Sequence, residues 1–285
     1  MQNLNELAKD KRFLRSILDN NGVLPQDIDP DAFTYALLAN LASPDSELRD
    51  ELSYMVLASA IIDKGRLTET QIEKLLATSL DENHLFYHIG EIGTNSVFMR
   101  SFSNLIIAAI LYDDVKSPKL SAHLIAHTKA ALLRYAQQEH DWRGYIMGKG
   151  WAHAMAHLAD SLDECAQNRF MQQEDREQIL DTVRSLAQLV EPLYNEEDIR
   201  LATVVYHIIV TRQVTDVFLD QWLASCYIER GTDVATWTSV TNMKNFLRSL
   251  YFLLQWDNMS MHFAEQISVL LRRLDDVYIQ TSDGR

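Results

Sequence analysis

The sequence has few of the residues that break helices or cross-link chains. Its 285 residues include five prolines, nine glycines and two cysteines. No run of alternating apolar and polar residues is long enough to predict a sheet, so the chain favours helices. Cys165 and Cys226 lie far apart in no metal-binding spacing, which argues against a disulfide framework or a thiolate zinc cage. We expect both cysteines to be packed thiols.

Positive charge and long apolar runs are also scarce. The chain has 26 Lys and Arg against 40 Asp and Glu, a formal net charge of -14. A negative surface repels phosphate backbones, so we predict no nucleic-acid partner. The longest apolar run, 105–112, is far shorter than the roughly twenty residues of a membrane helix. Residues 1–13 lack the apolar stretch of a secretion signal. We therefore expect a cytoplasmic protein with no membrane partner.

What the sequence does contain is a succession of helix signals. Four predicted helix starts carry a capping side chain: Asp29 before Pro30, Ser43 before Pro44, Ser117 before Pro118, and Thr68 with Gln71. Helical patterns run over 31–41, 46–62, 69–80, 95–112, 118–139, 150–168, 173–193, 198–211, 215–228, 237–255 and 258–276.

The order of these segments predicts the fold class. Short connections make neighbouring helices antiparallel, and paired amphipathic helices resemble the HEAT and armadillo classes of α-solenoid. No linker-like stretch interrupts the chain. We predict a single all-α domain over 1–285, built as a curved stack of antiparallel helical hairpins. A closed α/α barrel is the alternative architecture.

Glycine and polar residues concentrate in the middle of the chain. Five of the nine glycines fall between residues 90 and 150, beside the polar clusters 88–103 and 139–151. Loops rich in glycine, charge and aromatic residues on a helical scaffold are typical of functional sites. We therefore place the candidate site within 90–165.

The segment 148–160, GKGWAHAMAHLAD, predicts a helix with a polar face. On a helix beginning at residue 150, His153, His157 and Asp160 share one face, and Trp151 falls on the opposite, apolar face. Two histidines four residues apart bind one metal ion in many proteins, and Asp160 is a third possible ligand. These three residues are thus candidate ligands of a divalent metal such as zinc.

A metal enzyme would need a general base from elsewhere in the chain. In the metalloprotease motif H-E-x-x-H the glutamate supplies this base, but Ala154 stands at that position here. Glu91 and Glu139, from the neighbouring polar clusters, are the candidates. A polar network without metal is the alternative interpretation of the same residues.

The same turn also favours anion binding. Gly148 and Gly150, before the predicted helix, would leave backbone N–H groups pointing outward, and Lys149 adds a positive charge. Arg100 and Arg143 are candidates for a fork on the same anion, and Trp151 for an aromatic platform. In the alternative interpretation, the two arginines pair with the acidic residues Glu139 and Asp141 and tie hairpins together.

Two stretches resemble a known family. The segments 96–110 and 139–164, with the pattern RGY…GKGWAHA…AH…AD, are similar to an uncharacterised bacterial family over most of the chain, most specifically over 90–165. The resemblance implies an all-helical, cytoplasmic bacterial protein. It implies no assigned activity and no catalytic residue.

Three functional hypotheses follow. In the first, a helical-repeat binding or scaffold protein holds a peptide or small anionic ligand in a polar groove around 148–160; its lining residues are Arg100, Arg143, Lys149, Trp151, His153, His157 and Asp160. The second is a metal-dependent hydrolase or lyase that uses His153, His157 and Asp160. The third is a structural assembly whose polar stripe mediates self-association. We favour the first and leave the oligomeric state open.

Overall fold

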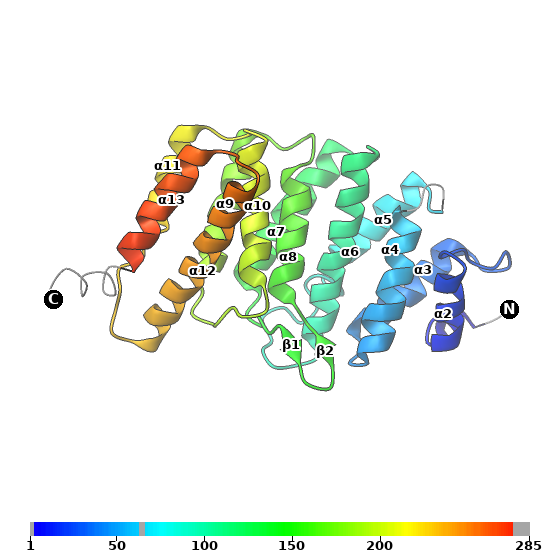
Figure 1. Cartoon of the computed structure of the whole chain (residues 1–285). Helices are drawn as coiled ribbons and strands as arrows, with labels where there is room; N and C mark the ends of the chain where they lie inside the picture. Colours follow the sequence, from blue (N-terminus) through cyan, green and yellow to red (C-terminus); the bar gives the residue numbers. More distant parts are fainter. Residues whose placement is uncertain (1–2, 63–65, 276–285) are drawn as a thin grey trace. The chain divides into compact units, whose positions relative to one another are not determined.

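The computed structural model describes residues 3–62 and 66–275. Within them, helices make up most of the chain, and the sheet consists of two short strands (Figure 1). The prediction of an all-α fold is confirmed. The chain divides into two compact units, Met1–Phe170 and Met171–Arg285, each described here by itself. The single domain over 1–285, the curved solenoid stack and the closed α/α barrel stay predictions.

The first unit contains the candidate site. Its elements are α1 (Leu4–Leu7), α2 (Lys11–Asp19), α3 (Pro30–Leu38), the 3-10 helix η1 (Ala39–Ala42), the π-helix η2 (Glu47–Tyr54), α4 (Met55–Ile62), α5 (Glu69–Ser79), α6 (Ser96–Lys116), α7 (Ala122–Gln138), β1 (Tyr145–Ile146), β2 (Gly150–Trp151) and α8 (Ala154–Ala166).

The second unit is built from helices in its described part. They are α9 (Gln173–Ala187), α10 (Glu197–Val210), α11 (Asp216–Ser225), α12 (Val234–Trp256) and α13 (Met261–Leu274). Asn242 of α12 fixes the connection after α9: its buried amide donates to the carbonyls of Leu189 and Glu191 and accepts from the backbone N–H of Leu193.

Two of the four predicted helix starts are confirmed. The Asp29 side chain caps α3 with proline at the first helical position, and Thr68 makes the capping box of α5. The other two are wrong. Ser117 ends α6, and Ser121 caps α7. After Ser43 the chain enters a π-helix only at Glu47, without a side-chain cap.

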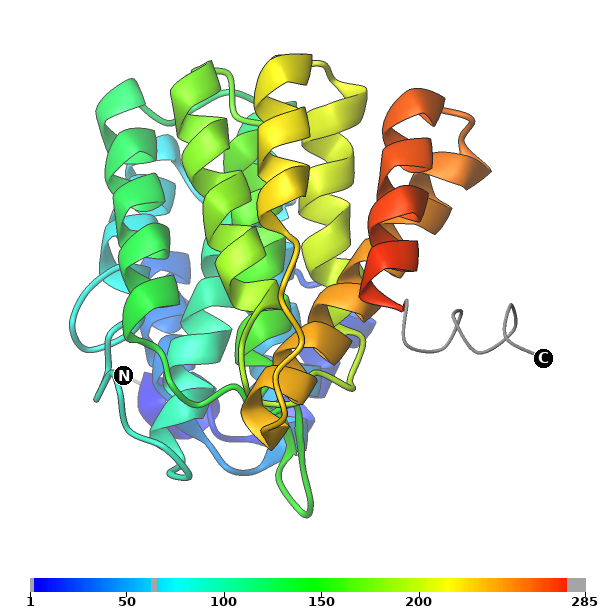
Figure 2. The ribbon, with the colours of Figure 1, turned by 90° about the vertical axis from the view of Figure 1, so that its left-hand side faces the viewer.

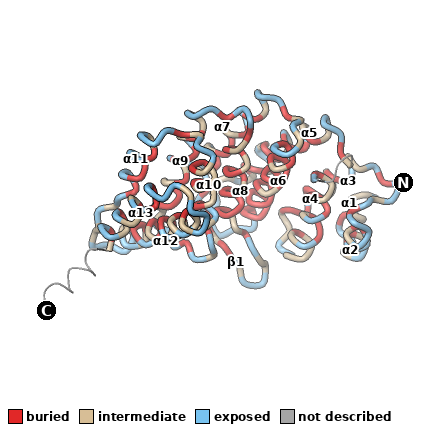
Figure 3. The backbone as a smooth tube through the Cα atoms, turned by 45° about the horizontal axis from the view of Figure 1, so that its top comes forward, coloured by how far each residue is buried: buried red, intermediate tan, exposed pale blue. Residues whose placement is uncertain are grey.

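Helix α6 is the centre of the first unit. It is apolar on most sides and buried along nearly its whole length, as expected for a helix packed all round. It contacts α4, α5, α8 and η1, and it lies beside α8 in both ribbon views (Figures 1 and 2). Figure 3 shows that α6 and α8 form a buried core, whereas the hairpin at β1 is exposed or half-buried. The buried core formed by α6 and α8 therefore supports the candidate site.

The prediction of a helix beginning at residue 150 is wrong. Gly150 and Trp151 form a strand, and α8 begins at Ala154. Trp151 is 37% exposed and does not belong to an apolar helix face. The small side chains of α8 allow close packing: Ala154, Ala156 and Ala159 are buried where α6 and α7 pack against this helix.

Two further predictions were made from composition. Cys165 and Cys226 are both buried, as expected of packed thiols. Burial raises the pKa of the Cys226 thiol to about 12, so this side chain stays protonated at neutral pH. In the part of the chain that the structure describes, no helix has both the length and the apolar character of a membrane span.

The buried carboxylate of Asp114 ties α6 to the ends of α7 and α8. It accepts hydrogen bonds from the backbone N–H groups of Lys119 and Leu120 and from the side chains of Asn168 and Arg169, at 2.6 to 2.8 Å. Burial acts to raise the pKa of Asp114, but these hydrogen bonds outweigh it and hold the pKa below the ordinary value of 3.8. The folded protein therefore prefers the ionised form.

We expect Asp114→Asn to lower the free energy of unfolding by about 2 kcal/mol at pH 7, because hydrogen bonds to a charged group are lost. The folded-state pKa is depressed, so the stabilisation is present above the ordinary pKa and disappears as the pH falls through the folded-state pKa. Urea unfolding of both proteins from pH 7 down to pH 3 should show the difference between their free energies of unfolding becoming smaller. Glu82→Gln, at an exposed position, is the control. A difference in free energy of unfolding that does not depend on pH would contradict the assignment.

Candidate functional site

The segment 145–151 is a short hairpin that extends beyond the helix ends of the first unit (Figure 1). Tyr145 pairs with Trp151 and Ile146 with Gly150. Gly150 has a left-handed backbone (φ +78°), and a Cβ atom there would lie 2.6 Å from the Cβ atom of Ser46. Glycine is needed at this position because the hairpin backbone touches the segment before η2.

Arg49, in the π-helix η2, fixes the hairpin through hydrogen bonds to its backbone. Its Nη2 atom donates to the carbonyls of Lys149 (2.8 Å) and Trp151 (3.0 Å), and Nη1 donates to the carbonyl of Ser43 (2.6 Å). The guanidinium lies 3.9 Å from the centre of the Phe98 ring, a cation–π contact. Arg49 has no exposed surface, and burial lowers its pKa to about 10. The hairpin is thus a tethered element.

His153 lies between the hairpin and the helix rather than on a helix face. It is the residue before α8 and has a left-handed backbone (φ 50°), an uncommon conformation for a residue with a side chain. Its ring stacks on Trp151, with ring centres 4.1 Å apart, and stands edge-on to His157 at 5.9 Å. The predicted pair is therefore brought together, but by a turn and a helix.

His157 is buried and bonded to α6. Its Nδ1 atom lies 2.8 Å from Oγ and 3.2 Å from the carbonyl oxygen of Ser101. A carbonyl only accepts, so Nδ1 carries a hydrogen, and in the neutral ring Nε2 is the acceptor nitrogen. The Ser101 hydroxyl donates to the carbonyl of Ala152. Ser101 therefore connects the histidine to the end of the hairpin.

Acidic groups surround this turn. Burial first, and then the negative charges of Asp160 and Asp50, raise the pKa of Tyr54 to about 12. Burial also raises the pKa of Asp50, and the positive charges of Arg49 and His153 act in the opposite direction. The π-helix η2 thus contributes charged residues to the vicinity of His153.

The described residues contain no group of three or more His, Cys, Asp or Glu side chains arranged to hold a metal ion. His153, His157 and Asp160 lie in one region of the first unit, so they remain the residues to test. Metal binding by these three side chains stays a prediction.

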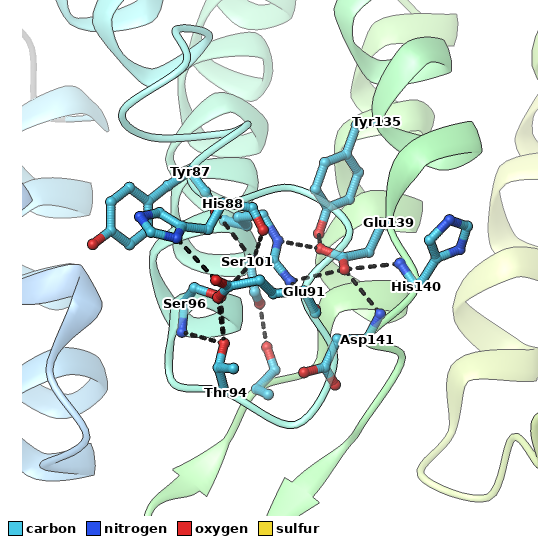
Figure 4. A network of polar contacts seen from close by, with 12 residues as sticks. Tyr87, His88, Glu91, Thr94, Ser96, Ser101, Tyr135, Glu139, His140 and Asp141 are labelled. Carbon is cyan, nitrogen blue, oxygen red and sulfur yellow. Dashed lines mark hydrogen bonds and ion pairs between the residues drawn. The ribbon is translucent and has the colours of Figure 1, made fainter.

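Arg100 and Glu139 form a buried ion pair, and Figure 4 shows the polar network around Glu139. The Arg100 Nε atom lies 2.6 Å from Oε2, and Nη2 lies 2.9 Å from Oε1. Nη1 donates to Ser96 Oγ and to the carbonyls of Tyr87 and His88. Neither side chain of the pair has exposed surface, so neither reaches a ligand in this structure. The pair corresponds to the alternative interpretation, in which these residues tie elements together.

The carboxylate of Glu139 has no capacity to act as a general base in this arrangement. It also accepts from the Tyr135 hydroxyl and from the backbone N–H groups of His140 and Asp141, each at 2.9 Å. The same network raises the pKa of Tyr135 well above its ordinary value, with burial the largest cause. These bonds occupy the carboxylate oxygens of Glu139 and fix the carboxylate in place.

Glu91, the other candidate base, lies in the loop before α6. His88 Nδ1, Ser96 Oγ and Thr94 Oγ1 hydrogen-bond to its carboxylate at 2.8 to 3.0 Å. These contacts, that of His88 above all, lower the pKa of Glu91 to about 2. A carboxylate with such a pKa is a weak proton acceptor near neutral pH.

Arg143 lies just before the hairpin and Lys149 lies in its turn, and both are half-buried. Arg143 binds both oxygens of Asp141, at 2.6 and 2.5 Å, and donates to the carbonyl of Thr94. Lys149 Nζ donates to Oδ1 of Asn95 at 2.8 Å, a neutral acceptor. In the described part of the chain the Lys149 ammonium makes no ion pair, so its charge stays available to an anionic group.

Sequence reasoning missed the contribution of η2. Arg49, Asp50 and Tyr54 were read as part of an ordinary second repeat helix. One signal existed: Arg49 lies three residues before Leu52 and seven before Val56, on the face that packs inward. An arginine on an apolar face requires internal acceptors, and the hairpin carbonyls provide them.

Comparison with known proteins gives one match. The family model described as "Protein of unknown function (DUF2785)" matches residues 85–252, more than half of the chain. The matched region includes the hairpin, His153 and the Arg100–Glu139 pair, whereas Arg49 and the rest of η2 precede it. No curated protein and no solved structure matches the chain.

The buried pair predicts a specific pattern of stabilities. We expect Arg100→Met to lower the free energy of unfolding by about 3–5 kcal/mol, because it leaves the Glu139 charge buried without its partner. The double variant Arg100→Met/Glu139→Gln should be more stable than this single variant. Urea unfolding of the two single variants, the double variant and the native protein forms the cycle, and losses that simply add would contradict the coupling.

The hydrogen bonds from Arg49 to the hairpin backbone predict a local effect as well. Arg49→Met should lower the free energy of unfolding by about 3 kcal/mol, since two hairpin carbonyls lose their donor. Amide hydrogen exchange over 145–151 should become faster than in the native protein, while exchange over 171–275 stays unchanged. Arg134→Met, at a position whose side chain is 44% exposed, is the matched control. Unchanged exchange in the hairpin would show that Arg49 does not hold it.

Proposed function

This chain belongs to the DUF2785 family of proteins of unknown function, and we propose that it is a helical binding protein. In this proposal the hairpin 145–151 and the turn at His153 hold a short peptide that carries an acidic group. The helices serve as a scaffold, and no catalytic step is required. The proposal rests on one observation, an anchored hairpin that exposes large apolar side chains.

The exposed side chains supply the contact area. Tyr145 is 52% exposed, Met147 87% and Trp151 37%, all on one seven-residue hairpin. Exposed apolar side chains that gather in one place are typical of interaction sites. Tyrosine and tryptophan in particular contribute much of the binding energy at protein interfaces.

Rigidity of the hairpin favours affinity. Its backbone is fixed by Arg49, and the Trp151 ring stacks on His153. A binding surface that is already ordered loses less conformational entropy when a ligand arrives. The left-handed conformation of His153 is consistent with this role, because strained residues gather at functional sites.

Charge supports an acidic group on the ligand. The Lys149 ammonium is bonded to a neutral amide, whereas Arg143 on the neighbouring loop is already paired with Asp141. Of the three cations predicted to form an anion site, Lys149 therefore carries this role, and the buried Arg100 does not take part. Asp50 and Asp160 disfavour anions deeper in the turn, so the acidic group belongs at the hairpin end.

A selection experiment tests the proposal. Random heptapeptides displayed on phage are selected on the native protein after depletion on the double variant Tyr145→Ala/Trp151→Ala. We expect enriched peptides that contain apolar residues and Asp or Glu. For a synthetic peptide of this set, Trp151→Ala should raise Kd about thirtyfold, which corresponds to a hot-spot loss of about 2 kcal/mol.

Two controls separate the hairpin from general effects. Tyr194→Ala removes a 77% exposed aromatic ring of the second unit and should leave Kd unchanged. Lys149→Gln should weaken acidic peptides more at low salt than at high salt. Absence of enriched peptides, or equal losses from Tyr194→Ala and Trp151→Ala, would refute binding at the hairpin.

A further inference from the structure

The methionines of this chain differ widely in their exposure to solvent. Met147, at the end of the hairpin 145–151, is 87% exposed, more than any other methionine in the described part of the chain. Met55 and Met261 follow, with 48% and 40% exposed. The remaining described methionines are buried or half-buried. An oxidant that arrives from solvent therefore reaches the thioether of Met147 most readily.

The two cysteines do not compete for such an oxidant. Both Cys165 and Cys226 are buried, and peroxide oxidises the thiolate form of cysteine rather than the thiol. Burial raises the pKa of the Cys226 thiol to about 12, which keeps it protonated at neutral pH. A thioether has no proton to lose, so its reaction requires only access. Met147 is thus the sulfur atom most open to oxidation among the described residues.

The hairpin has room for an added oxygen atom at its end. Gly148, the next residue, has a left-handed backbone (φ +75°), and a Cβ atom there would meet no described atom within 4 Å. The hairpin backbone is held by Arg49 and by the pairing of Tyr145 with Trp151. Neither contact uses the Met147 side chain. Oxidation therefore changes the chemistry of the exposed surface and leaves the hairpin in place.

We propose that Met147 is a site of reversible oxidation by peroxide, which controls peptide binding at the hairpin; this inference rests on the function proposed above. The sulfur atom attacks one oxygen of hydrogen peroxide. An S–O bond forms, the O–O bond breaks, and the other oxygen leaves as water, so that sulfur is oxidised and peroxide is reduced. A methionine sulfoxide reductase with a dithiol restores the thioether, forming a disulfide and water.

The chemical change at Met147 acts directly on the contact surface. The thioether is apolar and flexible, and it lies between the exposed rings of Tyr145 and Trp151 in the sequence of the hairpin. The sulfoxide is polar, and burying it against an apolar side chain of a peptide costs free energy. The charge of Lys149 does not change. We therefore expect the reduced protein to bind the acidic peptide and the oxidised protein to release it.

Peptide mapping by mass spectrometry tests the site without any ligand. Native protein is treated with hydrogen peroxide, the reaction is stopped at intervals with catalase, and the sulfoxide at each methionine is measured. We expect Met147 to be oxidised about twofold faster or more than Met55 and Met261, because its side chain is the most accessible. The inference is overturned if either of these two methionines is oxidised as fast as Met147.

Binding of a synthetic peptide from the phage selection tests the control of the hairpin. After complete oxidation of Met147 and removal of peroxide, Kd should rise about tenfold, because an apolar contact is lost. Treatment with the reductase and dithiothreitol should restore the original Kd. Met147→Leu is the matched control: its Kd should be the same before and after peroxide, because leucine is not oxidised.

The outcomes separate this inference from the proposed function. If Trp151→Ala weakens the peptide but oxidation of Met147 does not, control by oxidation is refuted and binding at the hairpin stands. A peroxide effect of equal size in Met147→Leu would overturn the assignment to Met147. If no peptide binds the native protein, the proposed function fails, and control of binding by Met147 fails with it.

Discussion

A guanidinium that leaves water must find acceptors inside the protein for its N–H groups. The first unit buries two such groups completely, Arg49 and Arg100. Arg100 is neutralised by a carboxylate, whereas Arg49 relies on backbone carbonyls and on the faces of Phe98 and Phe102. Both arginines therefore make hydrogen bonds to irregular segments that lie around α6. The loops of the candidate site are therefore ordered because two buried cations depend on them.

The two arginines hold different parts of the site. Arg100 orders the loop before α6 and the connection after α7, through Ser96 and Glu139. Arg49 fixes the hairpin from a segment far away in the sequence. Between them, Ser101 links His157 to the hairpin end. The polar residues that the sequence concentrates in the middle of the chain thus work largely as internal supports, and the contact surface is left to the hairpin.

Local signals in the sequence predicted much of the fold, and tertiary contacts explain what they missed. The caps at Asp29 and Thr68 act within a few residues, so the sequence shows them directly. Gly150 and Trp151 have the pattern of a helix start, but Arg49 and the strand pairing hold them in the hairpin. The hydrophobic periodicity of the sequence cannot predict these tertiary contacts. His153 and His157 lie close together, but through a turn before α8 rather than along one helix face, and only the structure shows that turn.

The distance in sequence between Arg49 and its acceptors has a consequence for how the chain is made. The hydrogen bonds from Arg49 to the carbonyls of Lys149 and Trp151 span 100 and 102 residues. Such non-local contacts form late, because loop closure must precede them. During synthesis on the ribosome, the Arg49 side chain therefore stays hydrated until the hairpin has been synthesised. The surface that we assign to ligand binding is thus completed only after both halves of the first unit have emerged.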